Sequence, residues 1–320
     1  MDWSYALCSP EEQVLWPRLS VFADTFDASA AEAVCGWDGI APGDVPGLLD
    51  ALVDSSILTV LERSGRVRYR MLGTIRQYGH DRLSEPGQAT ALRQRHRDWY
   101  LSLVAGAEAE WYGPKQLRRF SRLRLEHAEL QRALELSLAA PDRDEAGLLI
   151  ASSLWIYWTA CGLIGEGRGW LDRALRSPTG PSRVRAKALW AAGWLAAFSG
   201  DAEAAVRLAA DSRLLAGQLH DASGLAYAAH VSGLAAALRG DLAAAEACFD
   251  EALAGHRAVG DRAGVQLDLG QQALVASLRG DTASTTLRYE QSRAAGEQNG
   301  ESWHLSELTL GEGMAPLAAG

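Results

Sequence analysis

Residues 233 to 253 have the sequence GLAAALRGDLAAAEACFDEAL, in which a Gly-Asp pair separates two alanine-rich stretches of helical character. The same pair recurs with a strict period of 40 residues, at Gly200-Asp201, Gly240-Asp241 and Gly280-Asp281. Such a period is typical of repeat proteins, in which neighbouring units stack to bury their apolar faces. We therefore predict an array of helix pairs over 183–320, with a turn at each Gly-Asp and the aspartate capping the next helix.

Small residues recur in phase with these turns: Gly193, Gly233 and Ala273 stand seven residues before them, and Ala205 and Ala245 stand five residues after the first two. Small side chains let two helices approach closely where they cross. In the second unit, six residues stand in the relative positions of the tetratricopeptide consensus, which the unit resembles: Gly233, Gly240, Ala245, Phe249, Ala252 and Leu253. The resemblance implies a right-handed α-superhelix.

Two less regular segments flank these units. A degenerate helix-pair repeat is predicted at 146–182, with its turn at Gly162. At the other end, Gly313 and Gly320 keep the repeat phase, and the chain stops where another turn is due. We therefore expect the array at 183–320 to be truncated at its C-terminus.

The first 88 residues have a different pattern. Ser9-Pro10-Glu11-Glu12 is a capping box with proline at the first helical position, and it predicts a helix that ends near Phe22. Further helices are predicted at 28–35, 45–54 and 74–83, and strands at 57–62 and 67–71. Three helices, a β-hairpin and a helix make a winged-helix domain at 1–88. A helical connector or atypical first repeat follows at 89–145, with helices at 93–108 and 116–138, so the fold is mainly α.

The composition limits the possible functions. A formal charge of −9 and a pI near 5.3 oppose nonspecific attraction to nucleic acid. The four cysteines form no C-x-x-C pair and the N-terminus has no export signal, so a cytoplasmic location is expected. The uncharged stretch 146–165 is long enough to span a bilayer, but Ser152, Ser153 and Thr159 and the lack of basic flanking clusters favour a buried helix.

No pattern of catalytic or metal-binding residues stands out. The only lysines are Lys115 and Lys187, and neither belongs to a phosphate-binding G-x-x-x-x-G-K-[ST] loop. The seven histidines include no H-E-x-x-H motif, and no G-x-S-x-G motif occurs. The sequence therefore predicts a protein that is not an enzyme, with no catalytic residue and no metal site.

The winged helix poorly matches a DNA-binding surface. Its third helix at 45–54 contains Asp50 and Asp54 and no basic residue, so it would repel phosphate. The wing is basic, with Arg63, Arg66, Arg68 and Arg70, which could contact phosphate or an acidic neighbouring domain. We favour packing within the protein. Another arginine run, Arg118, Arg119, Arg122 and Arg124, is interpreted as a solvated helix face with i, i+4 pairing to glutamate.

The best candidate for a binding site is the inner face of the repeats. Alignment on Gly193 places five residues on this side of the superhelix: Trp190, Trp194, Phe198, Tyr227 and His230. They could line a groove for a ligand or a partner. The alternative is that aromatic residues at helical spacing form the core between repeats.

Several short motifs resemble actinobacterial regulators with a STAND-type ATPase. They are Asp2-Trp3-Ser4-Tyr5, Leu19-Ser20-Val21-Phe22, Tyr69-Arg70-Met71-Leu72, Thr74-Ile75-Arg76-Gln77-Tyr78, Glu166-Gly167-Arg168 and Trp170-Leu171. Such proteins are transcriptional activators of the LuxR or antibiotic-regulatory type, with an ATPase, a winged helix, a tetratricopeptide sensor and a separate DNA-binding domain. The resemblance implies that this chain corresponds to the middle of such a regulator.

The resemblance also implies a nucleotide-sensing position after the wing. Related ATPases have a Met-His-Asp motif there, and the matching residues of this chain are Met71, Leu72 and Gly73. Leucine cannot hydrogen-bond a phosphate, so only the position of the motif is retained. We expect no cofactor in this chain, and ATP or ADP only where the ATPase domain is present.

These observations lead to one main hypothesis and two alternatives. The chain is expected to be a regulatory sensor, with repeats that bind an inducer or a protein partner and a winged helix that packs on an ATPase domain. The first alternative is a stand-alone tetratricopeptide adaptor for protein interactions. The second is a DNA-binding protein that uses the winged helix. No membrane association is expected.

Overall fold

The computed structural model describes residues 1–83, 86–139 and 145–300. The described chain forms two compact units. The first comprises the described residues within 1–104 and 121–141, and the second comprises 105–120 and the described residues that follow 142. The chain therefore passes from one unit to the other inside two helices, α6 (Pro86–Ala109) and α7 (Gln116–Leu125). The domain boundaries predicted at 88, 145 and 182 remain predictions.

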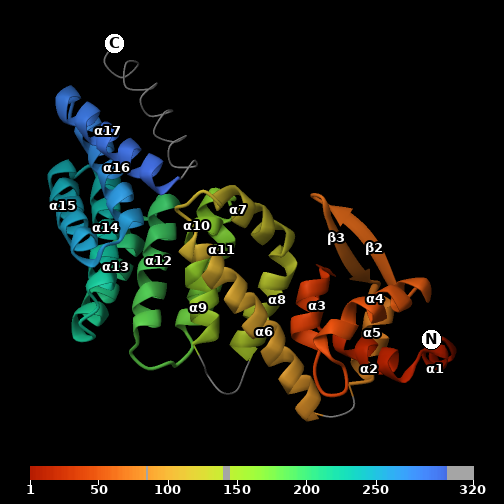
Figure 1. Ribbon diagram of the computed structural model, residues 1–320. Coiled ribbons are helices and arrows are strands. Elements are labelled where there is room, and N and C mark those ends of the chain that lie inside the picture. The colour runs from red at the N-terminus through yellow and green to blue at the C-terminus, as the bar shows by residue number, and fades with distance from the viewer. Residues whose placement is uncertain (84–85, 140–144, 301–320) are drawn as a thin grey trace. The chain divides into compact units, whose positions relative to one another are not determined.

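The first unit begins with a winged helix, as predicted, in which a β-hairpin projects from a group of helices (Figure 1). Its elements are α1 (Asp2–Leu7), α2 (Pro10–Leu19), β1 (Thr25–Phe26), α3 (Ala28–Cys35), the 3-10 turn Pro42–Asp44, α4 (Val45–Asp54), β2 (Leu58–Arg63), β3 (Arg66–Met71) and α5 (Gly73–Asp81). The predicted capping box forms at the start of α2: Ser9 Oγ accepts from the Glu12 amide, and Glu12 Oε2 accepts from the Ser9 amide.

The sheet has three antiparallel strands in the order β1-β3-β2. A two-residue turn joins β2 and β3, with Ser64 and Gly65 both at positive φ, as a tight hairpin turn requires. The third strand, β1, was not predicted. It pairs Thr25 with Arg70 and Phe26 with Tyr69, and so closes one edge of the hairpin. Phe26 lies fully buried in the core together with Trp16 on α2 and Leu49 on α4.

The first part of α6, the end of α7 and the next helix, α8, complete the first unit. The single helix predicted at 116–138 is two helices, α7 and α8 (His127–Ala139), which meet at Glu126. Glu126 has a buried side chain that bonds to the wing, as described below, and the backbone turns at this residue.

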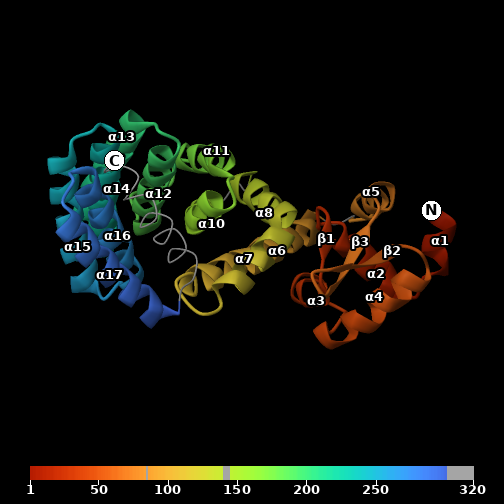
Figure 2. The same ribbon diagram turned by 90° about the horizontal axis from the view of Figure 1, so that it is seen from above.

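The second unit consists of antiparallel helix pairs of tetratricopeptide type (Figure 1, Figure 2). The three regular pairs are α12 (Arg183–Phe198) with α13 (Ala202–Gln218), α14 (Ala222–Leu238) with α15 (Leu242–Val259), and α16 (Arg262–Leu278) with α17 (Thr282–Asn299). Before them lie α9 (Ala146–Ser153), α10 (Trp155–Ala160) and α11 (Ile164–Leu175). The residues of a fourth unit around Gly313 and Gly320 lie outside the described residues.

The turns within the pairs form as predicted. Gly200, Gly240 and Gly280 have φ values of 79°, 78° and 75°, which favour glycine. The aspartate after each one caps the second helix, because its Oδ1 accepts from a backbone amide three residues later at 3.0–3.1 Å.

Small residues lie where helices cross, as predicted. A methyl group added at Gly193 would come within 2.8 Å of the Val231 side chain, and one added at Gly233 would come within 2.7 Å of the Phe249 ring. These two glycines therefore allow neighbouring helices to approach more closely than alanine would.

The uncharged stretch 146–165 is mostly buried as far as Trp158, and it does not form one helix. It contains α9 and α10, separated at Leu154, and the start of α11. Ser152 and Ser153 precede the break. Ser152 Oγ bonds back to the carbonyl of Leu149, a local bond that competes with regular helix geometry. Within the described residues, no helix has both the length and the apolar character needed to cross a bilayer.

Candidate functional site

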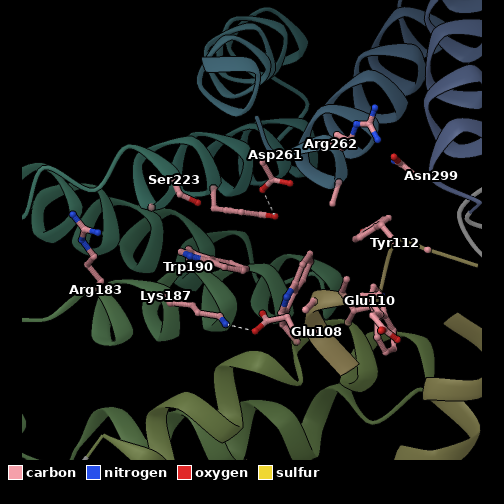
Figure 3. A pocket seen from close by; sticks show the side chains of 18 of the residues that line it. Glu108, Glu110, Tyr112, Arg183, Lys187, Trp190, Ser223, Asp261, Arg262 and Asn299 are labelled. Atoms are coloured by element: carbon pink, nitrogen blue, oxygen red, sulfur yellow. Dashed lines mark hydrogen bonds and ion pairs between the residues drawn. The ribbon is translucent and has the colours of Figure 1, made fainter. Parts of the chain in front are cut away.

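The second unit contains a pocket of about 810 Å³ at the first turns of α12, α14 and α16. These three helices are the first members of their pairs, and they begin beside one another along one side of the pocket (Figure 3). The opposite side is formed by the end of α6 and by the α6–α7 loop, residues 110–115. The end of α17 closes the remaining edge with Gln298 and Asn299.

Aromatic side chains line the floor of the pocket. Trp190 on α12 stacks on Tyr227 on α14, with ring centroids 4.3 Å apart and planes 10° from parallel. Trp155 on α10 meets both rings edge-on, at 5.2 Å and 5.9 Å. All three are at least nine-tenths buried, so packing holds the rings in place before any ligand binds.

Charged groups surround this floor. Lys187 on α12 pairs with Glu108 at the end of α6, with 2.5 Å between Nζ and Oε2 (Figure 3). Asp261, the N-cap of α16, accepts from the Gly264 amide and from the Tyr227 hydroxyl, at 3.0 Å and 2.9 Å. Burial and the nearby Asp261 carboxylate raise the pKa of Tyr227 well above its usual value of 10, so this hydroxyl keeps its proton.

The α6–α7 loop is held at both of its ends. Glu110 pairs with Lys115 at 3.2 Å and with Arg119 at 2.7 Å, and these bonds lower the pKa of the Glu110 carboxyl. Trp111 packs on Phe120 with 4.0 Å between ring centroids. A methyl group added at Gly300 would lie 3.2 Å from Pro114, so the loop also touches the end of α17. The loop therefore joins the first and last elements that line the pocket.

The structure separates the five predicted groove residues into two groups. Trp190 and Tyr227 line the pocket. Trp194 is buried in packing: its Nε1 donates to Thr159 Oγ1 at 3.1 Å, and its ring stacks on His230. Phe198 is 40% exposed and stacks on Trp194 at 4.8 Å. Whether any of them contacts a ligand remains a prediction.

His230 belongs to a buried cluster of two histidines and one carboxylate. Its Nδ1 lies 2.5 Å from Asp268 Oδ1, and His256 Nδ1 lies 2.7 Å from Asp268 Oδ2. All three side chains are fully buried and join α14, α15 and α16. The Nε2 atoms of both rings lack a partner within the described chain. The cluster stabilises the contact between two pairs, and it lies outside the pocket lining.

The turns that precede α14 and α16, on one side of the pocket, were not predicted from the sequence. Asp221 and Asp261 precede α14 and α16, and His220 and Gly260 before them have positive φ. These two turns are also 40 residues apart, offset by half a period from the Gly-Asp turns. This second series of turns was detectable, and it would have placed the first turns of α14 and α16 next to each other.

The first unit contains a buried polar network between the wing and the helices α6 to α8. Arg68 on β3 pairs with both carboxylate oxygens of Glu126, and both side chains are fully buried. Arg68 Nε also donates to Thr25 Oγ1 at 3.1 Å. Burial lowers the pKa of the Arg68 guanidinium, but the hydrogen bonds and charge of Glu126 raise it by more, so the pKa lies above its usual value. The Arg68 guanidinium therefore stays protonated.

A second buried carboxylate binds the chain next to the wing. Glu129 on α8 accepts from the amides of Ala23 and Asp24 at 3.0 Å and 2.7 Å, and lies 3.0 Å from His96 Nε2 on α6. Together with Arg68 and Glu126, these bonds attach the sheet to α6 and α8. The prediction that the wing packs within the protein is confirmed for Arg68.

The other predicted arginines have varied roles. Arg63 and Arg70 are about half exposed and lie 3.9 Å and 3.4 Å from Asp24. In the second arginine run, Arg122 makes the expected i, i+4 pair with Glu126 at 3.1 Å. Its side chain is only 11% exposed, however, so this part of the helix face is not solvated. The reason is its second partner, Asp27 at the start of α3.

The outer face of the winged helix is acidic and apolar. On α4, the exposed residues include Asp50 and Asp54. Val60 and Val67 are 49% and 56% exposed and lie on one face of the hairpin, because their cross-strand partners are Tyr69 and Glu62. Such a surface suits a protein contact better than a phosphate backbone.

The nucleotide-sensing position lies at the start of α5. Met71 is buried, Leu72 is 52% exposed and is the N-cap residue, and Gly73 is the first helical residue. Leu72 offers no hydrogen-bonding side chain, and no side chain caps the helix. The residues present do not fit side-chain recognition of a phosphate.

Comparisons with known proteins agree with this architecture. Residues 8–84 match the family model of a winged helix-turn-helix domain. A Mycobacterium tuberculosis protein, named as a candidate HTH-type transcriptional regulator, is 35% identical over 175 residues, which are 55% of this chain and 20% of that protein. An uncharacterized protein of the same species is 41% identical over 98 residues, or 30% of this chain and 25% of that protein. The chain thus spans a quarter or less of these relatives.

A solved structure has the same fold. It is the crystal structure of a signal transduction ATPase with numerous domains (STAND) protein with a tetratricopeptide repeat sensor, from Pyrococcus horikoshii. The alignment covers 92% of this chain and 46% of that one, with a TM-score of 0.50 and 15% sequence identity. At this identity the similarity concerns the fold alone.

Proposed function

We propose that this chain is the sensor portion of a STAND-type, ATP-binding transcriptional regulator of the LuxR or antibiotic-regulatory type. The helix pairs bind an inducer or a protein partner, and the chain itself catalyses no reaction. The single observation that supports this proposal most strongly is the pocket at the first turns of α12, α14 and α16. It is concave, aromatic and rimmed by a few polar groups, as ligand sites are.

In this proposal the winged helix packs on an ATPase domain of a longer protein. The exposed Val60 and Val67 on the hairpin and the acidic face of α4 support a protein contact. ATP or ADP would bind in that ATPase domain, since Leu72 lacks a group that could bond a phosphate. A cytoplasmic location is part of the same proposal.

The proposal is tested by screening candidate inducers and partner proteins against the whole chain by thermal shift. Val184 is the residue to vary, because it lines the pocket, whereas Trp194 serves packing. A ligand of the pocket should raise the melting temperature of the wild-type chain. It should have little effect on Val184→Trp, in which a large side chain is introduced at a pocket-lining position. Equal stabilisation of both proteins would contradict the proposed site.

Two alternatives remain distinguishable by experiment. An in-frame P-loop ATPase segment in the flanking DNA supports the regulator, and a complete gene without one supports a stand-alone adaptor. For DNA binding through the winged helix, the chain should be retained on duplex DNA in a salt-dependent manner. We expect no retention even at low salt, because Arg68 is buried and α4 exposes aspartates.

A further inference from the structure

Two arginines at the pocket have no internal counter-charge. Arg183 and Arg262 are exposed at the first turns of α12 and α16, and neither forms an ion pair within the described residues (Figure 3). The lysines of the same lining differ, because Lys187 pairs with Glu108 and Lys115 pairs with Glu110. Two guanidinium groups are thus available to a ligand, and guanidinium binds carboxylate-like anions well.

The helix ends add positive potential at the same edge. Three helices begin at this pocket, and each N-terminus has a partial charge of about +0.5. The side chains of Ser182 and Asp261 cap α12 and α16. Asp221 precedes α14 but makes no side-chain capping bond, so the first amides of that helix lack a side-chain acceptor.

Formal charges in the lining balance, with four acidic and four basic side chains, in a chain whose net charge is −9. Of the acids, Glu108 and Glu110 are paired with lysine, and Asp261 bonds Gly264 and Tyr227. Asp221 is the remaining acid, and it faces the positive end of α14. With the helix ends included, the edge of the pocket is positive in an otherwise acidic protein.

The rest of the lining suits a flat apolar body. Trp155, Trp190 and Tyr227 form the floor. Trp111 in the α6–α7 loop is 97% buried, and its indole N–H has no acceptor among the described residues.

We propose that the pocket binds a small organic anion with a flat aromatic body. The ring system lies against the aromatic floor, and the carboxylate or sulfonate group binds at the helix N-termini, with Arg183 at one end of that edge and Arg262 at the other (Figure 3). This inference rests on the proposed sensor role of the same pocket, and it adds the chemical class of the ligand. An organic cation is opposed by the two unpaired guanidinium groups.

Two dyes that share a ring system test the inference. 1-Anilinonaphthalene-8-sulfonate is an aromatic anion, and N-phenyl-1-naphthylamine is its uncharged counterpart. Fluorescence titration of the whole chain at low salt should give one saturable site for each dye. The sulfonate should bind about tenfold more tightly, a ratio typical of hydrogen bonds to a charged group. Added salt should weaken the binding of the sulfonate dye only.

Variants separate the contributions of charge and of the floor. Arg183→Gln and Arg262→Gln should each lower the affinity for the sulfonate dye about two- to fivefold and leave the affinity for the neutral dye unchanged. Arg207→Gln on the outer helix α13 is the matched control, because Arg207 is exposed and lies outside the pocket lining. Trp190→Ala, or Val184→Trp if the former disturbs the helical circular dichroism, should weaken both dyes.

The outcomes distinguish the ligand class from the site itself. If both dyes bind equally well and the arginine variants behave like Arg207→Gln, the anion inference is wrong, and the pocket stands as a site for neutral ligands. If neither dye responds to Trp190→Ala and Val184→Trp, the pocket is not a ligand site. That result overturns the proposed sensor role of this surface as well.

Discussion

At the scale of single residues, the most consequential contact is the buried pair between Arg68 and Glu126. Replacing only one partner leaves a buried charge without compensation, so Arg68→Met and Glu126→Leu should each lower the free energy of unfolding by about 3–5 kcal/mol. The double variant should lose much less than the sum, because it buries no unpaired charge. Urea denaturation of all four proteins measures this. Additive losses would mean that the pair is not coupled.

Asp27 gives the first unit a pH dependence. Burial opposes its charge, but the hydrogen bond from Arg122 and the amide of Ala30 lower the pKa of its carboxyl below the usual value. The stability that this carboxylate provides is therefore full above about pH 4 and is lost as the pH falls through the lower pKa of the folded state. Between pH 5 and 2, Asp27→Asn should flatten the fall in unfolding free energy, and Asp54→Asn on the exposed face should not. An unchanged slope for Asp27→Asn would refute this.

The cluster of His230, Asp268 and His256 makes a different prediction. In Asp268→Ala, two buried imidazoles lose their acceptor, and each loss costs about 1–3 kcal/mol. The array should therefore be less stable by about 2–6 kcal/mol in thermal or urea unfolding. Asp211→Ala on the exposed surface of α13 serves as the control. A loss for Asp268→Ala no greater than for the control would show that the cluster does not stabilise the array.

At the scale of elements, the regular helices were predictable because local signals specify them. The capping box, the Ser64-Gly65 turn and the Gly-Asp turns each depend on residues close in the chain. The strand β1 was missed because two residues cannot show an alternating pattern, and its partner β3 is distant in sequence. The break at Glu126 was missed too: this residue bonds a buried partner, Arg68, that is distant in sequence.

Helix crossings provide a prediction at this scale. Gly233→Ala places a methyl group within 2.8 Å of three atoms of the Phe249 ring, so neighbouring helices must shift. We expect a loss of about 1–3 kcal/mol. Gly169→Ala lies inside α11 in open space and should instead gain about 0.5–1 kcal/mol from higher helix propensity. Thermal unfolding of both variants tests the contrast, and a stabilising Gly233→Ala would show that the crossing tolerates a methyl group.

At the scale of the whole molecule, sequence periodicity predicted the array. It also predicted five groove residues, and two of these, Trp190 and Tyr227, line the pocket. Periodicity alone could not predict the pocket's other wall. Pro114 in the α6–α7 loop contacts Gly300, which is far from it in sequence. Such a contact depends on how successive pairs accumulate rotation, which one repeat does not encode.

The bonds within the first unit predict how stable two of its fragments are. A fragment of residues 1–139 retains Glu126 and Glu129, whereas residues 1–88 lack both partners of the wing. The longer fragment should unfold cooperatively in urea. The shorter one should be less stable by at least about 3 kcal/mol, because it lacks the carboxylates that bond Arg68 and the chain before β1, and also the helices that carry them. Equal midpoints for the two fragments would contradict the role of the network.

The network between the wing and α8 also bears on how this chain is made. Translation delivers residues in order, and Arg68 leaves the ribosome 58 residues before Glu126. During that interval the nascent winged helix has no counter-ion for a guanidinium that it must eventually bury. Its sheet should therefore be unstable, and accessible to proteases and chaperones, until α8 has been synthesised and packs against it. The N-terminal domain is then finished only after the α6–α7 loop, a wall of the second unit's pocket, has already been synthesised.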